Sequence, residues 1–138
     1  MNQGGKKIIR ELIYPELSYK VMSVIFEVHN KVGNKWREID FCNAIEIVLK
    51  REKMNYEREK KVSIEFEGSK FAECRLDFII ENKMILEVKK VWRLGDSEIK
   101  QALRYLDAAG LKLAIIVNIK HRRVQSTRVV NPKVDKHD

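Results

Sequence analysis

The sequence has few of the residues that build zinc sites. Only two of its 138 residues are cysteine and three are histidine, and neither type occurs at the spacings that zinc sites use. Cys42 falls on the apolar stripe of a predicted helix and Cys74 on the apolar face of a predicted strand. We therefore expect both to be small core residues, which suits a reducing cytoplasm.

Long apolar runs, repeats and linkers are also missing. No stretch approaches the roughly 20 consecutive apolar residues that cross a bilayer, and residues 1–7 do not resemble a signal peptide. The sequence shows no internal repeat and no low-complexity run. We therefore expect one cytoplasmic domain over residues 1–138, large enough to bury a core and without a membrane partner.

Charge, by contrast, is abundant and unbalanced. Lys and Arg number 28 against 20 Asp and Glu, for a formal net charge of +8. This sign favours a polyanionic partner, nucleic acid before an acidic membrane surface. Basic residues are concentrated in a C-terminal segment, about residues 120–138. This segment is predicted to contact nucleic acid, with a merely solubilising tail as the alternative.

Helical and strand periodicities follow one another in a defined order. Apolar residues three and four apart predict helices over about residues 15–32 and 36–53. Alternating residues then predict three strands, followed by a helix over about 96–109. The apolar run 111–118 predicts a strand buried on both faces, and a last short strand is expected near 127–130. The order ααβββαβ(β) predicts an α/β fold with a small mixed sheet flanked by helices.

Two of these strands form a predicted hairpin that carries opposed carboxylates. A three-residue turn centred on Asn82 places Asp77 directly opposite Glu87, with their Cβ atoms roughly 5 Å apart. Carboxylates so close repel each other, and a shared Mg²⁺ or Mn²⁺ would remove the repulsion. Lys89 lies two residues further along the same face. The alternative is a solvated polar face on which Arg75 and Lys89 pair with the two acids.

Helical residues on either side of the hairpin extend this pattern. Glu38 stands at the head of an apolar stripe, which aims it at the protein body. Its alternative is a first-turn acid favoured by the helix dipole, a role that Asp40 fills equally well. Gln101 and Tyr105 share one face of the later helix. They are either ordinary helix surface or lie toward the sheet edge where Lys89 emerges.

The residues together resemble the PD-(D/E)XK nuclease superfamily, in which an Asp on one strand precedes Glu-x-Lys on the next. The Gln-x-x-x-Tyr element is similar to that of the RecB-like branch. More narrowly, residues 16–131 resemble the small proteins named for a GxxExxY motif. This narrower likeness rests on Glu16–Lys20, Phe26–Asn30, Arg75–Asp77, Glu87–Lys89, Gln101, Tyr105 and Gly110–Leu113. The name-giving motif is altered, since Lys35 and Phe41 replace its Gly and Tyr, and Leu76 replaces the Pro of the superfamily name.

The resemblance implies a restriction-endonuclease-like core that hydrolyses nucleic-acid phosphodiester bonds, in DNA more than in RNA. The catalytic residues that it implies are Glu38, Asp77, Glu87, Lys89, Gln101 and Tyr105. The implied ligands of Mg²⁺ or Mn²⁺ are Asp77, Glu87, the carbonyl of Val88, and Glu38, directly or through water. Basic residues expected to contact phosphates are Lys90, Arg93, Lys100, Arg104, Lys120, Arg122, Arg123 and Arg128.

Two further expectations concern partners. A chain of 138 residues leaves no room for a separate recognition domain, so specificity is expected from a homodimer or from another protein. The alternative to a nuclease is a non-catalytic nucleic-acid-binding or partner subunit that retains the fold. A third alternative, a protein whose basic face meets an acidic membrane, leaves the opposed carboxylates unexplained.

Overall fold

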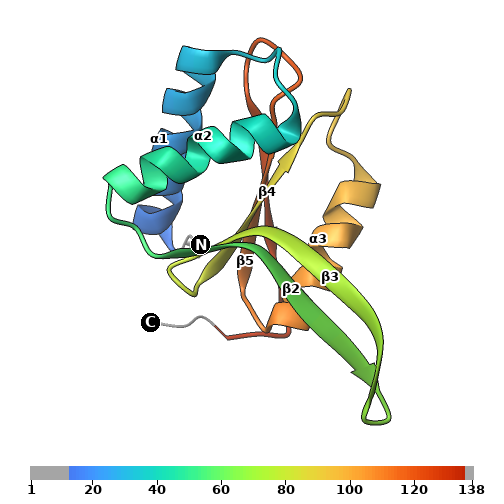
Figure 1. The fold of residues 1–138 in the computed structure, drawn as a ribbon. Coiled ribbons are helices and arrows are strands. Elements are labelled where there is room, and N and C mark those ends of the chain that lie inside the picture. Colours follow the sequence, from blue (N-terminus) through green and yellow to red (C-terminus); the bar gives the residue numbers. More distant parts are fainter. Residues whose placement is uncertain (1–12, 136–138) are drawn as a thin grey trace, which may run out of the picture.

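A computed structural model describes residues 13–135 of the chain. Over this range the helices and strands follow the predicted order, including the short last strand (Figure 1). The elements are α1 (Pro15–Val32), α2 (Glu38–Arg51), β2 (Tyr56–Phe66), β3 (Ser69–Ile80), β4 (Met84–Lys89), α3 (Asp96–Ala109), β5 (Leu113–Asn118) and β6 (Gln125–Val130). No helix among these residues is long and apolar enough to cross a membrane.

The strands form one mixed sheet in the order β2-β3-β4-β5-β6. β4 and β5 run parallel, with α3 as the connection between them, and the other neighbours run antiparallel. All six residues of β5 are buried, as predicted for a strand that lies between two layers. The mixed sheet and the α/β class are thus confirmed.

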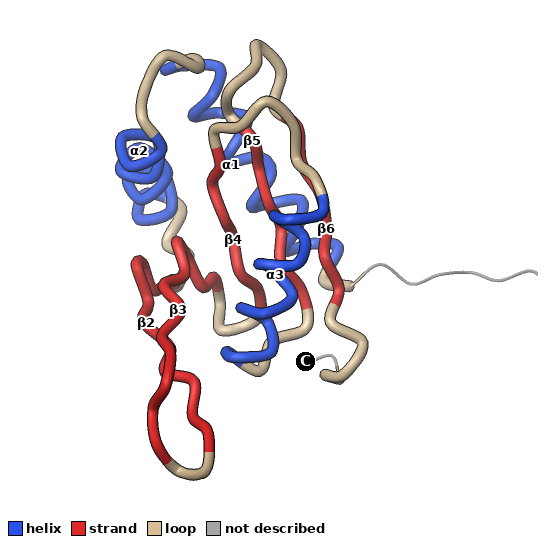
Figure 2. Tube along the Cα trace, turned by 90° about the vertical axis from the view of Figure 1, so that its right-hand side faces the viewer, coloured by secondary structure: helices blue, strands red, loops and turns tan. Residues whose placement is uncertain are grey.

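Helices cover both faces of the sheet. α1 and α2 pack on one face, where Ile25, Phe41 and Phe78 belong to one buried cluster. α3 packs on the other face, where Leu106 and Ile85 belong to a second cluster. Figure 2 shows α1 and α3 on opposite sides of the sheet. Cys42 lies in the first cluster and Cys74 in the second, so the expectation that both cysteines are core residues is confirmed.

The β2–β3 ribbon bends where it reaches Asp77. Strict alternation predicts that Leu76 and Phe78 share a face, but Phe78 packs under α1 and α2 while Leu76 packs with α3. The two strands keep one register on both sides of this point, and Glu59, the β2 residue between the paired positions, has a left-handed φ of 53°. The ribbon therefore changes faces at Asp77, and its outer half extends away from the rest of the sheet (Figure 1).

Several predicted boundaries need correction, among them the starts of β5, at Leu113 and not 111, and of β6, at Gln125 and not 127. β2 begins at Tyr56, before the alternating Val62, Ile64 and Phe66 from which this strand is predicted, because residues 57–61 are all charged and show no apolar alternation. α2 runs from Glu38 to Arg51 and is shorter at both ends than the predicted 36–53. α1 ends as predicted at Val32, and Gly33 after it has a φ of 78°, which suits a residue without a side chain.

Candidate active site

The centre of the site is the end of the β3–β4 ladder. Backbone pairing stops at Phe78 and Leu86 in a register centred on Asn82, as predicted. Beyond that pair, the side-chain carboxylates of Asp77 and Glu87 accept the hydrogen bonds of backbone N–H groups. The Asp77 N–H donates to Glu87 Oε2 (2.9 Å), and the Val88 N–H donates to Asp77 Oδ2 (2.8 Å). Each acid thus accepts a bond from the backbone of the other strand, which holds both carboxylates at the point where the strands part.

Both carboxyl groups are removed from water. Glu87 is only 4% exposed, and Asp77 is partly buried. Burial raises the pKa of Asp77 above its ordinary value. Burial, reinforced by the negative charge of Asp77, raises the pKa of Glu87 to about 8. The pair therefore resists carrying two negative charges unless a cation or a proton lies between the two groups.

Neither acid has an ion-pair partner in the part of the chain that the structure describes, although the positive charge of Lys89 lowers the pKa of both. Arg75 forms its ion pair with Glu59 (3.0 Å), and Lys89 Nζ donates to Gln101 Oε1 (2.5 Å). Among residues 13–135, neither Asp77 nor Glu87 lies within ion-pair distance of a Lys, Arg or His nitrogen. The alternative expected from the sequence, cross-strand pairing with Arg75 and Lys89, is therefore not formed.

α3 positions the end of Lys89. The helix begins after Gly95, whose N–H donates to Glu98 Oε1 (2.8 Å), and it brings Gln101 against the Lys89 ammonium. Tyr105 follows one helical turn later on the same face. Burial, and then the charge of Glu87, raises the pKa of Tyr105, so its hydroxyl stays neutral at physiological pH and can donate a hydrogen bond.

The two acids in the first turn of α2 have different hydrogen-bond partners. Asp40 Oδ2 accepts bonds from the Arg37 N–H (3.1 Å) and Nε (2.9 Å), so it caps the helix. Glu38 Oε2 instead accepts the Lys90 N–H (2.8 Å), directly beyond β4. Glu38 is exposed, so the expectation that it points into the protein body is wrong. It reaches the loop after β4 instead.

A small cleft lies between Glu38 and Asp77. It has a volume of about 150 Å³ and is lined by Glu38, Ile39, Cys42, Arg58, Glu59, Arg75 and Asp77. The charge of Glu38 is one of the causes that raise the pKa of Asp77. Among residues 13–135, however, no three His, Cys, Asp or Glu side chains are grouped closely enough to hold a metal ion. Glu38 therefore does not complete a three-carboxylate cluster with Asp77 and Glu87.

A family model of the PD-(D/E)XK nuclease superfamily matches residues 15–129. The chain belongs to this superfamily. The matched range contains both strands of the Asp77 hairpin and the helices that carry Glu38 and Gln101. The wider resemblance seen in the sequence is thus confirmed, and the narrower likeness to the GxxExxY proteins stays a prediction.

The crystal structure of SSO0001 has a similar fold, with a TM-score of 0.56 and 21% identity. The similarity covers 86% of this chain and 61% of that one. The PD-(D/E)XK chain therefore spans less than two thirds of SSO0001, and at this identity the likeness concerns the fold alone. No curated protein matches the chain.

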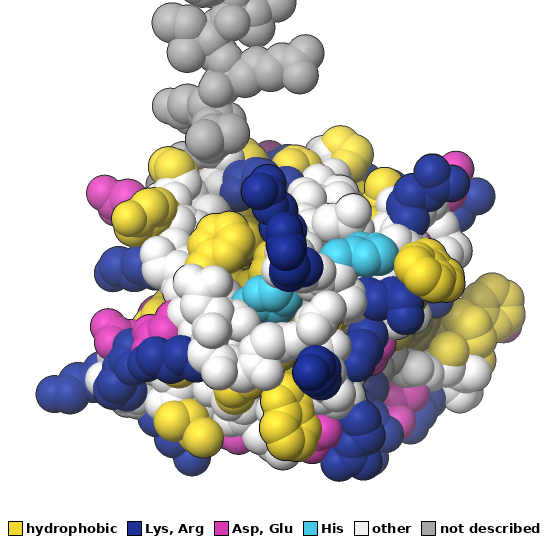
Figure 3. Space-filling view, turned by 90° about the horizontal axis from the view of Figure 1, so that it is seen from above, with side chains coloured by type: hydrophobic (Ala, Val, Ile, Leu, Met, Phe, Trp, Pro, Cys, Tyr) yellow, Lys and Arg dark blue, Asp and Glu magenta, His cyan; other side chains and the backbone are white. Residues whose placement is uncertain are grey.

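The basic residues predicted to contact phosphates lie at several places on this PD-(D/E)XK chain. Lys90 and Arg93 follow β4, and Lys120, Arg122 and Arg123 lie between β5 and β6. Figure 3 views the molecule from above the end of β4 and shows Lys and Arg side chains across this face. Lys100 and Arg104 project instead from the exposed side of α3.

Arg128 differs from the other basic residues. Its guanidinium donates to Ser18 Oγ (2.7 Å) and to the Ile13 carbonyl (2.6 Å). These bonds tie β6 to the start of α1, and burial lowers the pKa of Arg128. Arg128 thus links elements of the fold, whereas its predicted phosphate contact has no support from its position.

Sequence reasoning missed three residues near the site. Trp36 and Trp92 are 54% and 78% exposed, and each lies within three residues of a predicted site residue, Glu38 and Lys89. Arg58 lines the cleft beside Asp77, where Glu46 Oε1 holds its Nη1 at 3.0 Å. The closeness of the tryptophans to the motif was a usable signal. No such signal existed for Arg58, because its position beside Asp77 depends on the register between β2 and β3.

Proposed function

We propose that this PD-(D/E)XK domain is a divalent-metal-dependent nuclease that hydrolyses phosphodiester bonds, in DNA more than in RNA. The observation that carries the proposal is the pair of opposed carboxylates, Asp77 and Glu87. They are held at the parting ends of two strands and lack a cationic partner among residues 13–135. Burial of two such acids costs folding free energy, so a binding role explains them better than a structural one.

The donor set fits a hard cation. Carboxylate and carbonyl oxygens are the ligands that Mg²⁺ and Mn²⁺ prefer, and an ion between Asp77 and Glu87 would offset the repulsion that raises the pKa of Glu87. The ligands would be Asp77, Glu87 and the Val88 carbonyl, with Glu38 acting through water. When bound, such an ion polarises the scissile phosphate and lowers the pKa of a water molecule.

The remaining residues act on the substrate and on the attacking water. Lys89 is the cation at the site, and its ammonium would stabilise negative charge that builds up on the phosphate. Gln101 holds that ammonium through its Oε1 atom and is a positioning residue. Tyr105, neutral and half-buried beside Glu87, would donate a hydrogen bond to the substrate or support Lys89.

The direct test is cleavage by the purified chain of a panel of DNA and RNA strands, duplexes and branched structures. We expect cleavage with Mg²⁺ or Mn²⁺ and none in EDTA, because the ion supplies several kcal/mol of transition-state stabilisation. Binding to nucleic acid without turnover in either metal would instead favour the non-catalytic subunit. Cleavage that persists in EDTA would exclude the proposed chemistry.

Glu38→Gln tests the role of the acid on α2. The glutamine can still accept the Lys90 N–H, so we expect the free energy of unfolding to change by no more than about 1 kcal/mol. Loss of a charge that acts on metal-bound water should lower the cleavage rate about tenfold or more and weaken its dependence on metal concentration. Rates measured across a Mn²⁺ titration check both effects.

Asp40→Asn is the matched control for Glu38→Gln. It alters a neighbouring acid that the helix cap uses, so it should affect stability and leave cleavage nearly unchanged. Equal and small effects of both substitutions on cleavage would mean that Glu38 only joins α2 to the loop after β4.

A further inference from the structure

Three loops meet beside the candidate site, at the end of the sheet where β4 terminates. They are residues 33–37, 90–95 and 119–124, and they connect α1 to α2, β4 to α3 and β5 to β6. The hydrogen bonds that join them run from Asn34 Nδ2 to the Lys120 carbonyl (2.8 Å), from Lys90 Nζ to the Trp36 carbonyl (2.8 Å) and from His121 Nε2 to the Trp92 carbonyl (2.6 Å). The loops thus form one continuous surface, which we call the three-loop face.

The three-loop face has a one-sided charge. It contains seven basic residues and no acidic one, although the chain has 20 Asp and Glu. The seven are Lys35, Arg37, Lys90, Arg93, Lys120, Arg122 and Arg123, of which Arg37 is paired with Asp40 of α2. Figure 3 shows this end of the molecule, with basic, histidine and hydrophobic side chains next to one another. Such a surface suits a polyanion.

Both tryptophans of the chain lie on this face. Trp92 is 78% exposed and Trp36 is 54% exposed, although Trp is a residue type that is highly buried on average. The Lys120 ammonium lies 4.7 Å from the centre of the Trp92 ring, and the His121 ring lies 5.8 Å from it. A large aromatic surface is therefore presented to solvent among cations that can contact phosphates.

Hydrogen bonds to a buried side chain hold the Trp92 loop in place. Asn118 is fully buried, and its side chain exchanges two hydrogen bonds with the backbone of Val91, at 3.1 Å and 2.8 Å. The Trp36 Nε1–H is likewise bonded to the Val32 carbonyl (3.0 Å). Positions fixed in this way lose little conformational entropy on binding.

We propose that Trp92 and Trp36 form a stacking site for unpaired nucleobases, which makes an unpaired strand the substrate class of the neighbouring active site. Aromatic side chains among cations bind single strands because each base offers a π-face. Inside a duplex that face is covered by adjacent base pairs. The substrate assignment rests on the proposed nuclease function, whereas the binding site can be tested without cleavage.

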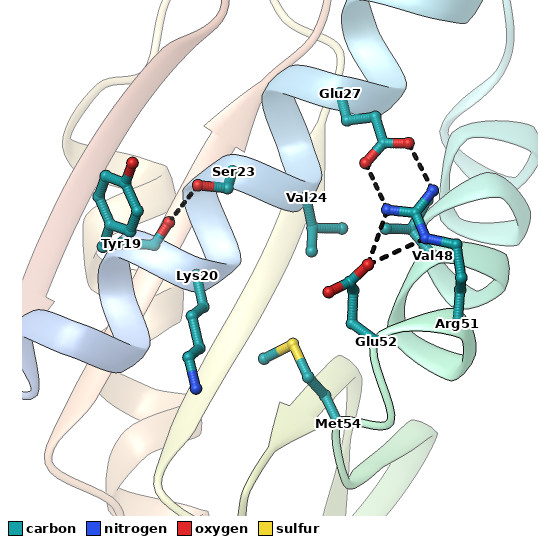
Figure 4. A pocket seen from close by; sticks show the side chains of 9 residues that line it. All are labelled: Tyr19, Lys20, Ser23, Val24, Glu27, Val48, Arg51, Glu52 and Met54. Carbon is teal, nitrogen blue, oxygen red and sulfur yellow. Dashed lines mark hydrogen bonds and ion pairs between the residues drawn. The ribbon is translucent and has the colours of Figure 1, made fainter.

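A cavity away from the three loops has a different character. It lies between α1 and α2, has a volume of about 280 Å³, and is lined partly by Tyr19, Glu27, Arg51 and Glu52 (Figure 4). Glu27 holds Arg51 at 2.7 Å through both oxygens, and Glu52 holds it at 2.9 Å, so the charge of Arg51 is already neutralised and Lys20 is the other cation of the lining. Tyr19 at its edge is 76% exposed and is thus a control matched to Trp92 in exposure.

The test measures affinity in EDTA for labelled oligothymidylate and for a DNA duplex with the same number of phosphates. Trp92→Ala should weaken oligothymidylate binding about 5- to 100-fold, the range expected for loss of one stacking aromatic. Duplex affinity should change by less than about twofold, since the phosphate contacts remain. Trp36→Ala should act in the same direction, Trp92→Phe should retain most of the affinity, and Tyr19→Ala should have no effect.

Several results would overturn the stacking site. They are unchanged oligothymidylate affinity in both tryptophan variants, equal losses on single strand and duplex, or no binding to either nucleic acid. If the expected pattern holds in EDTA but Mg²⁺ and Mn²⁺ give no cleavage, the proposed nuclease function fails and the stacking site stands.

Discussion

Asp77→Asn is expected to abolish metal binding and cleavage together. Asparagine keeps an oxygen for the Val88 N–H bond, so the local backbone is preserved, but it removes half of the charge that a divalent cation would bind. The cleavage rate should fall about a thousandfold or more, since several kcal/mol of stabilisation are lost and each 1.36 kcal/mol is about tenfold. Calorimetric titration with Mn²⁺ and single-turnover cleavage measure the two effects.

The same substitution should make the metal-free protein more stable at high pH. Because the folded state raises the pKa of Glu87 from 4.5 to about 8, it binds more protons than the unfolded state between these values. In EDTA, wild-type stability therefore falls as pH rises through this interval. The pKa of Glu87 is raised by its burial and by the charge of Asp77. Asp77→Asn removes the charge and leaves the burial, so the loss of stability with rising pH should be smaller. Denaturation in EDTA at about pH 5 and about pH 9 measures the difference.

Glu73→Gln is the control on the same strand. Glu73 is an exposed acid of β3 whose partner is Lys70, so its loss should alter neither Mn²⁺ binding nor cleavage. Asp77→Asn protein that binds Mn²⁺ with wild-type affinity would contradict the assignment of the carboxylate pair as the metal site. If Asp77→Asn protein were less stable than the wild type at high pH in EDTA, the charge repulsion from which the site was inferred would be contradicted.

Local sequence patterns were sufficient for the centre of the site. A three-residue turn and strict alternation fix the register of a hairpin, and that register alone predicts that Asp77 lies beside Glu87. Helical spacing likewise predicts that Gln101 and Tyr105 share one face of α3. Whether that face is helix surface or reaches Lys89 is decided only by the structure, in which Lys89 Nζ donates to Gln101 Oε1. The register and the shared face depend only on residues close in sequence or on a single turn, which is why the amino-acid sequence is enough to predict them.

Relations between distant segments could not be predicted in the same way. The bend at Asp77 depends on a left-handed residue, Glu59, in the neighbouring strand, and φ > 0 is uncommon for a non-glycine residue. The bond from the Lys90 N–H to Glu38 joins residues 52 positions apart. The three-loop face is assembled from three separate connections, so the grouping of its cations with Trp36 and Trp92 appears only in the folded chain.

The largest effect expected without loss of the metal is that of Lys89→Ala. Lys89 is the cation held at the site by Gln101, and removal of one donor that stabilises transition-state charge lowers turnover about 10²- to 10³-fold. The carboxylate pair is untouched, so Mn²⁺ should still bind by calorimetry. Lys83→Ala, in the turn at the opposite end of β4, is the matched control and should cleave normally. Cleavage by Lys89→Ala at the wild-type rate would refute the role assigned to Lys89.

Substitutions at Gln101 test whether turnover depends on the position of the Lys89 ammonium as well as on its presence. Gln101→Ala keeps the lysine but removes the oxygen that accepts from Nζ at 2.5 Å, so turnover should fall about tenfold or more, as for other supporting residues. Gln101→Glu restores an oxygen at the same reach and should recover most of the rate, whereas substrate affinity in EDTA should stay unchanged in both variants. A positioning role requires this recovery. If Gln101→Ala and Gln101→Glu lose activity equally, or if the loss lies in substrate binding, Gln101 contacts the nucleic acid and the orientation of Lys89 has another origin.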